Sequence, residues 1–283
     1  MGTALSARLI DARIPVMGFD VDLVRCSAFR DIGGEPAASA KDVVVQCRAV
    51  VVAVYSAAQA QSLFDEIEGL AELSHTVMIC TTTCAPHEIL AIAKRADDAR
   101  LPLVEAPLSG TSAEVREGSA TALLAGRTQT IEAVGSILGI LCPRQTRLGQ
   151  IGNAARTKLA LNLILQNNRA ALAEGIAFAE AIGLDAATFL ATARQSAAYS
   201  RVMDNKGRKI IARDFVPQSH IAQTLRDAEL ILGEGERCGQ ALPMTSVQAD
   251  LLRKTIARLG DACDSAAIIE AIRPSKGKSG AAS

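Results

Sequence analysis

The chain has 283 residues, of which 49% are apolar and only 3% aromatic, so its core must be built mainly from Ala, Leu, Ile and Val. Its 30 basic and 30 acidic residues give a formal net charge of zero, which argues against nucleic acid or an anionic membrane as the main partner. No apolar run could span a membrane, no signal peptide opens the chain, and the seven cysteines lack zinc-ligand spacing, which predicts a cytoplasmic protein without a metal site.

The first half of the sequence alternates short apolar runs with helical stretches. After an opening helix that begins near Gly2, the run "RAVVVAVYS" is nearly continuous in β-branched residues, the pattern of a strand buried on both faces. This alternation predicts a parallel sheet with helices on both faces, in an α/β domain of residues 1–148. We expect strands at 14–20, 48–56, 75–83, 101–110 and 119–127, and helices at 57–70, 84–99 and 128–141.

The second half changes character near "RLGQIGNAA", after which no convincing strand run appears. Long helical stretches follow, so we expect an all-helical domain over residues 149–272. The tail 273–283 contains Pro, Gly, Ser and Lys without apolar periodicity, and we expect it to be disordered. The predicted helices occupy 153–181, 186–196, 198–212, 218–236, 242–259 and 263–272.

The opening helix and the first predicted strand have the spacing of a dinucleotide site. Such a site needs a glycine-rich turn before a helix N-terminus, and an acid about 20 residues further on that binds the adenosine ribose. Gly2 lies 18 residues before Asp20, which ends the run "IPVMGFD". An acid after a short strand is also common as a turn residue, so the spacing alone leaves both interpretations open. If Asp20 binds the ribose, its charge disfavours a 2′-phosphate and favours NAD over NADP, unless a cation lies near; Arg25 is expected on the next helix.

The stretch "APLSGTSAEVREG" follows a predicted strand and forms a small turn that carries hydroxyl groups. Ser109, Gly110 and Thr111 can bring backbone N–H groups and hydroxyls to a carboxylate. Clusters of Gly, Ser and Pro also mark ordinary surface loops, and without other context that is the simpler interpretation.

The helix predicted at 153–181 is apolar around most of its circumference and should be largely buried. Lys158, Asn162 and Gln166 are spaced by four and share one face, so this polar stripe either faces solvent or lines a cleft. A partly desolvated lysine can act as a general acid or base near neutral pH. By default, the neighbouring Arg226 and Asp227 of a later helix form a surface ion pair.

Taken together, these stretches resemble the β-hydroxyacid dehydrogenase family, which includes 3-hydroxyisobutyrate dehydrogenase and tartronate semialdehyde reductase. The resemblance extends from Gly2 to about Ile272 and implies a Rossmann-like domain followed by a helical domain like the C-terminal domain of 6-phosphogluconate dehydrogenase. "APLSGT" resembles the family's substrate motif and "GQIGNAARTKLALN" its catalytic motif, while "TTTCAP" and "LRDAEL" resemble segments near the nicotinamide and the closed site. The resemblance thus implies catalysis by Lys158 and Asn162, substrate binding by Ser109, Gly110, Thr111 and Asp227, and cofactor binding by Gly2, Asp20, Tyr55, Thr83 and Arg226.

Several residues depart from the family's pattern. Ala154 and Thr111 replace common glycines, Leu161 replaces an asparagine, and Arg226 replaces a lysine, with which it is not interchangeable at a close contact. These changes put the substrate in doubt more than the chemistry.

The largest departure is at the start, because the family's first strand and earlier glycines would lie upstream of Met1. Met1 is either an internal methionine mistaken for a start, with about ten residues before it in the natural protein, or the start of a chain that is truly short. In the second case the sheet would lose a strand at its switch point and expose unpaired backbone groups. We favour the first case.

The resemblance implies an NAD(P)-dependent oxidoreductase that transfers a hydride between nicotinamide and a small β-hydroxyacid. Lys158 would take the hydroxyl proton, and Asn162 would position the lysine and the substrate. The long apolar helix after Lys158 predicts a homodimer or homotetramer. Two alternatives are an imine reductase of the same fold, which usually lacks the lysine, and a truncated non-catalytic oligomerising scaffold, which would not need Lys158 and Asn162.

Overall fold

The structure is a computed structural model that describes residues 1–70, 73 and 75–273. The chain divides into two compact units, the first of residues Met1–Lys158 and the second from Leu159 onward. The predicted domain limits, 1–148 and 149–272, stay a prediction. Apart from Arg273, the tail that we expected to be disordered lies outside the described residues.

The first unit contains a six-stranded sheet made of β3 (Ala49–Val52), β4 (Val77–Cys80), β5 (Leu103–Glu105), β6 (Leu108–Ser109), β7 (Thr121–Gly126) and β8 (Arg144–Arg147). The strand order is β3-β4-β5-β7-β6, and β8 pairs with β7. β3, β4 and β5 run parallel as expected, whereas β7 runs antiparallel to β5 and β6. The strand predicted at 101–110 is interrupted at Ala106–Pro107, because proline has no backbone N–H for a ladder hydrogen bond.

Two further strands, β1 (Met17–Gly18) and β2 (Glu35–Pro36), pair in parallel as a separate two-stranded sheet. The strand predicted at 14–20 is therefore only two residues long. Among the described residues, β3 pairs with β4 alone, so its other edge has no partner strand. Whether a further strand precedes Met1 in the natural protein stays a prediction.

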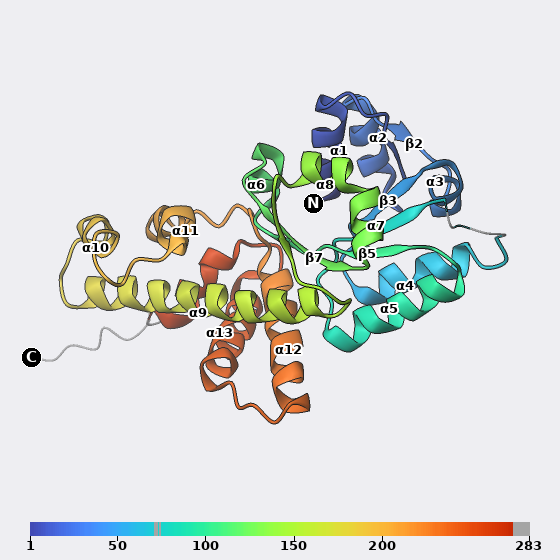
Figure 1. Cartoon of the computed structure of the whole chain (residues 1–283). Coiled ribbons are helices and arrows are strands. Elements are labelled where there is room, and N and C mark those ends of the chain that lie inside the picture. The colour runs from blue at the N-terminus through green and yellow to red at the C-terminus, as the bar shows by residue number, and fades with distance from the viewer. Residues whose placement is uncertain (71–72, 74, 274–283) are drawn as a thin grey trace, which may run out of the picture. The chain divides into compact units, whose positions relative to one another are not determined.

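Helices cover both faces of the large sheet (Figure 1). Successive side chains of a strand point to opposite faces, so Val52 packs with α4 (Ala57–Glu66) and α5 (Pro86–Asp98), while Val51 packs on the side of α1 (Gly2–Asp11) and α8 (Gly135–Leu141). The helix predicted at 128–141 is divided into α7 (Thr128–Ala133) and α8. The remaining helices of this unit are α2 (Leu23–Asp31), α3 (Ala40–Gln46) and α6 (Ser112–Glu117); α3, α6, β2 and β8 were not foreseen from the sequence.

The second unit is helical, and its longest element is the part of α9 from Leu159 onward. The sequence predicted α9 with its observed limits, Asn153–Ala181. Its described residues form no strand, only an isolated bridge between His220 and Asp264. The core packs around buried side chains such as Ile176, Ile210 and Leu252. The other elements are α10 (Ala186–Ala193), α11 (Arg201–Ala212), α12 (Ile221–Arg237), α13 (Pro243–Leu259), the 3-10 helix η1 (Ser265–Ile268) and α14 (Ile269–Ile272).

A buried ion pair joins α11 to the start of η1. The Lys206 ammonium lies 2.8 Å from both carboxylate oxygens of Asp264, and the two residues are 4% and 0% exposed. The Asp264 carboxylate also accepts backbone N–H groups of Gln218, Ser219 and Ala266. Burial raises the pKa of Asp264, but the hydrogen bonds from Lys206 and the backbone outweigh it and hold the pKa below its usual value.

None of the helices in the described part of the chain is both long and apolar enough to cross a bilayer. All seven cysteines are free thiols.

Candidate active site

The carboxyl ends of β3, β4 and β5 meet at one edge of the sheet, where open α/β sheets bind their ligands. Backbone hydrogen bonds hold the following loops together: Thr81 donates to Val52 at 2.9 Å, and Ala106 donates to Cys80 at 2.8 Å. Three candidate residues follow these strands: Tyr55 after β3, Thr83 after β4 and Ser109 beyond β5.

The predicted substrate loop is a tight turn that needs its glycine. Gly110 has a φ of 154°, and a Cβ at this position would lie 2.7 Å from the Cβ of Ala120. The Ser109 hydroxyl makes no hydrogen bond to the described residues, so it is available to a ligand. Thr111 caps α6: its hydroxyl accepts the Glu114 N–H, and its own N–H donates to the Glu114 carboxylate at 2.8 Å. Only the Thr111 hydroxyl proton therefore remains for a carboxylate, and its role in substrate binding stays a prediction.

A buried carboxylate that the sequence did not single out ties α9 to the sheet. Glu105, the last residue of β5, is 2% exposed and accepts the N–H of Gly152 at 2.6 Å and the N–H of Ala155. Burial raises the pKa of Glu105, although the backbone N–H groups favour its charged form. Lys158 follows Ala155 by three residues. An acid that ends a buried strand, directly before "APLSG", is the signal that could have pointed to this residue.

The polar stripe of α9 is buried, so its interpretation as a solvated face is wrong. Lys158 is 8%, Asn162 5% and Gln166 4% exposed. Arg169 continues the stripe and is also buried, with its guanidinium 3.5 Å from the Thr224 hydroxyl. Burial lowers the pKa of Arg169 to about 10, although Asp264 and Asp227 raise it. The sequence did not single out Arg169.

In the second unit, Asn162 is held by an acid of α12. Its amide nitrogen donates to Asp227 at 3.0 Å, and Gln223 donates to the other oxygen of the same carboxylate at 3.0 Å. Arg226 lies 3.8 Å from Asp227. Asp227 is buried, so the default interpretation of Arg226 and Asp227 as a surface pair is wrong. With its nitrogen engaged, Asn162 can present its carbonyl oxygen to a neighbouring donor.

The predicted cofactor residues of the N-terminal region lie near the start of α1 and the end of β1. Gly2 is the first residue of α1, whose N-terminal N–H groups receive no side-chain cap. Asp20 follows β1 and accepts the Asp22 N–H at 3.0 Å. Arg25 lies on α2 as expected, but its guanidinium reaches to 3.7 Å from Asp20. A cation therefore stands beside the proposed ribose acid, and its guanidinium also lies 3.4 Å from the carboxylate of Asp22.

Two family models match the chain almost end to end. A model described as the NAD binding domain of 6-phosphogluconate dehydrogenase matches residues 1–149, and one described as NAD-binding of NADP-dependent 3-hydroxyisobutyrate dehydrogenase matches residues 152–272. The chain belongs to the β-hydroxyacid dehydrogenase family.

Relatives and solved structures are similar to this β-hydroxyacid dehydrogenase over nearly its whole length. Glyoxylate/succinic semialdehyde reductase 2 of Arabidopsis thaliana is 25% identical, over 98% of this chain and 78% of its own. A 3-hydroxyisobutyrate dehydrogenase of Mycobacterium tuberculosis, solved with L-serine, has a TM-score of 0.87 at 21% identity and covers 97% of this chain and 96% of its own. An imine reductase from Pseudomonas sp. has a TM-score of 0.67 at 21% identity over 96% of each chain. Because both solved structures are only 21% identical to this chain, the likeness shows that the chain shares their fold and no more than that.

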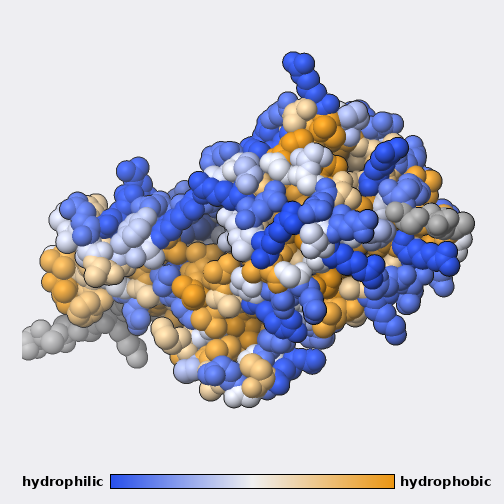
Figure 2. All heavy atoms as spheres, in the orientation of Figure 1, coloured by the Kyte–Doolittle hydropathy of each residue, from blue (hydrophilic) through white to orange (hydrophobic). Residues whose placement is uncertain are grey.

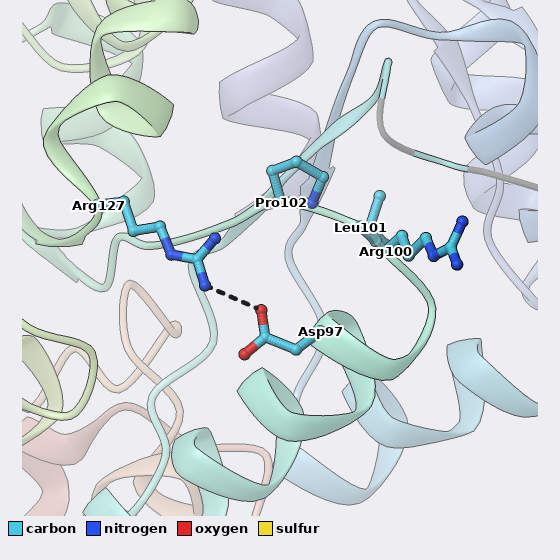
Figure 3. A pocket seen from close by; sticks show the side chains of 5 residues that line it. All are labelled: Asp97, Arg100, Leu101, Pro102 and Arg127. Atoms are coloured by element: carbon cyan, nitrogen blue, oxygen red, sulfur yellow. Dashed lines mark ion pairs between the residues drawn. The ribbon is translucent and has the colours of Figure 1, made fainter.

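A surface pocket of about 430 Å³ lies away from the candidate site of this β-hydroxyacid dehydrogenase (Figure 3). Leu101 and Pro102 line it and precede β5, so the pocket lies at the amino end of that strand, whereas Glu105 and the substrate loop lie at its carboxyl end. Asp97 and Arg127 face each other across the pocket at 3.6 Å.

Among the residues that the structure describes, no cluster of three or more His, Cys, Asp or Glu side chains could hold a metal ion. The groups suited to a nicotinamide dinucleotide are instead the N-terminus of α1, the acid at the end of β1 and the loops after β3 and β4.

Proposed function

We propose that this member of the β-hydroxyacid dehydrogenase family transfers a hydride between NAD(P) and the hydroxyl-bearing carbon of a small β-hydroxyacid. The observation that carries the proposal is a buried lysine on a helix that is anchored at the carboxyl end of the strand preceding the substrate loop. Lys158 and the free hydroxyl of Ser109 supply a proton acceptor and a carboxylate ligand. Bound nicotinamide supplies the hydride acceptor.

Residues of the chain orient the substrate, transfer the proton and position the lysine. Ser109, with the N–H groups of the glycine turn, orients the substrate carboxylate, and neutral Lys158 takes the hydroxyl proton as the hydride leaves the same carbon. In reverse, the Lys158 ammonium protonates the developing alkoxide. Asn162, one turn beyond Lys158 and fixed by Asp227, positions the lysine and the substrate.

The first experiment is a titration of the chain with NADH and then NADPH, followed by nicotinamide fluorescence. Saturable binding and turnover of at least one compound in a panel of small β-hydroxyacids would support the proposal. Binding without turnover of any hydroxyacid would remove it. A cyclic imine in the panel tests the alternative of an imine reductase, against which the presence of Lys158 argues.

We further propose that NAD is preferred over NADP, because Asp20 binds the ribose and because Arg25, the cation beside it, already pairs with the two carboxylates of Asp20 and Asp22. Replacing Asp20 with Ala should weaken NADH binding about tenfold, since a hydrogen bond to a charged group is lost. It should affect NADPH less, since a negative charge that repels the 2′-phosphate is removed and Arg25 keeps only one of its two carboxylate partners. The control is Asp22→Asn, which removes the other carboxylate that pairs with Arg25 but keeps a side chain that can cap α2, and which should leave NADH binding unchanged. Equal weakening of both cofactors by Asp20→Ala would contradict the proposed preference.

A homodimer or homotetramer is part of the proposal. Apolar residues of α9 are exposed, among them Leu161, Ile164 and Phe178, and Figure 2 shows apolar surface gathered over this part of the chain. Light scattering should give a mass of two or four chains, and Ile164→Lys should shift it toward one, because a charge would have to be buried. Val216→Lys, at an exposed apolar residue outside the helices, should leave the mass unchanged. A wild-type mass of one chain would exclude both oligomers. The cytoplasmic location stays a prediction.

A further inference from the structure

Glu105 binds the first turn of α9 from outside that helix. The first N–H groups of any helix lack partners within it, and a carboxylate is well suited to them because the helix dipole is positive at this end. The two oxygens of Glu105 each accept one such group, from Gly152 and from Ala155. Both oxygens must be acceptors for this contact, so the ionised carboxylate fits it, and an amide would present its own N–H to one of the donors.

The contact lies between the two segments on which the proposed reaction depends. Along one segment, Glu105 leads through Ala106 and Pro107 into Ser109 and the substrate loop. Along the other, Lys158 lies about one helical turn beyond Ala155, roughly 4.5 Å along the axis. All of these residues belong to the first unit. A displacement of the first turn of α9 would therefore move Lys158 relative to the loop.

A helix cap alone does not require this arrangement. A Ser or Asp side chain just before α9 would accept the same N–H groups as a local cap. Such a cap would not require the buried charge of a residue that is distant in the sequence. Such a cap would leave α9 unattached to β5. The position of Glu105 on the strand, 47 residues before Gly152, makes the contact a tether between two elements.

We propose that Glu105 is a positioning residue: its carboxylate fixes the first turn of α9, and with it Lys158, against the strand that carries the substrate loop. This inference rests on the proposed function, because the placement of Lys158 affects turnover only if Lys158 moves the proton. Glu105 itself touches neither the substrate nor the cofactor in this scheme.

The test replaces Glu105 with Gln in the full chain. We expect kcat to fall about 10²-fold, the loss typical of a catalytic group misplaced by about 1 Å, while the Kd of NADH stays within about twofold of wild type. Glu105→Asp keeps the charge with a shorter reach and should recover part of kcat. The control Asp185→Asn changes a carboxylate that caps α10 and should leave kcat unchanged. If Glu105→Gln does not fold, Glu105→Asp carries the test, with an intermediate kcat and an unchanged Kd.

Hydrogen exchange gives a readout that does not depend on activity. The Gly152 and Ala155 amides should exchange at least about tenfold faster in Glu105→Gln than in wild type, with no change in α5. Unchanged exchange would overturn the tether, and faster exchange with unchanged kcat would overturn the positioning role alone. A wild-type chain that binds NADH but converts no hydroxyacid would instead remove the proposed function, and the catalytic part of this inference with it.

Discussion

Replacing Lys158 with Ala is expected to lower kcat by 10²–10⁴-fold or more, to the limit of detection in an assay of NADH absorbance. A positioned general acid or base contributes rate factors of about this size. The Kd of NADH should change little, because the proposed cofactor residues lie on other elements of the chain. Folding should also be retained, since the substitution shortens a side chain without introducing a group that helix α9 disfavours.

Two further variants sharpen this expectation. Lys158→Arg keeps the positive charge but cannot be deprotonated near neutral pH, so it should be almost as inactive as Lys158→Ala. Lys209→Ala removes a lysine of α11 that pairs with Asp214, beyond the end of that helix, and should keep the wild-type kcat. Turnover retained in Lys158→Ala would remove Lys158 from the mechanism.

Replacing Asp264 with Ala is expected to lower the free energy of unfolding by about 3–5 kcal/mol, because it leaves the Lys206 ammonium buried without its counter-charge. The backbone N–H groups of Gln218, Ser219 and Ala266 would also lose their acceptor. Urea unfolding followed by circular dichroism measures the change. The matched control is Asp214→Ala, which breaks the exposed pair with Lys209 and should cost about 0–1 kcal/mol. Equal effects of the two variants would contradict the structural role of the buried pair.

The same site predicts an acid dependence of stability. The folded-state pKa of Asp264 is held below its unfolded value, so its stabilisation is fully present above a pH of about 4 and is lost as the pH falls through the lowered pKa. The stability difference between wild type and Asp264→Ala should therefore narrow below a pH of about 4.

The sequence predicted most of the large elements because their patterns are local. The observed α9 has the predicted limits, since an uninterrupted helical stretch of 29 residues leaves few alternatives. Strand ends were less well predicted, because pairing decides where a strand stops: the run at 14–20 keeps only Met17–Gly18 in a strand, paired with the short β2. The antiparallel course of β7 depends on neighbours that are distant in the sequence.

The candidate site was predicted residue by residue from the resemblance, but the contacts that hold it were not. Glu105 meets Gly152 across 47 residues, and Lys206 meets Asp264 across 58, so neither pair leaves a local pattern. The side chain of Arg25 reaches back to Asp20, which a helix assignment alone does not reveal. Burial was also beyond the sequence, because the stripe that includes Lys158 and Asn162 has the spacing of a solvated face as well as that of a cleft.

Among the described residues, one edge of β3 has no partner strand, and this edge bears on association between molecules. Its segment "AVVVAV" is rich in β-branched residues and contains neither charge nor proline, the composition that favours strand pairing between molecules. An edge of this kind is a template on which a strand of another copy can add. For the chain as printed, we therefore expect association through this edge at high concentration.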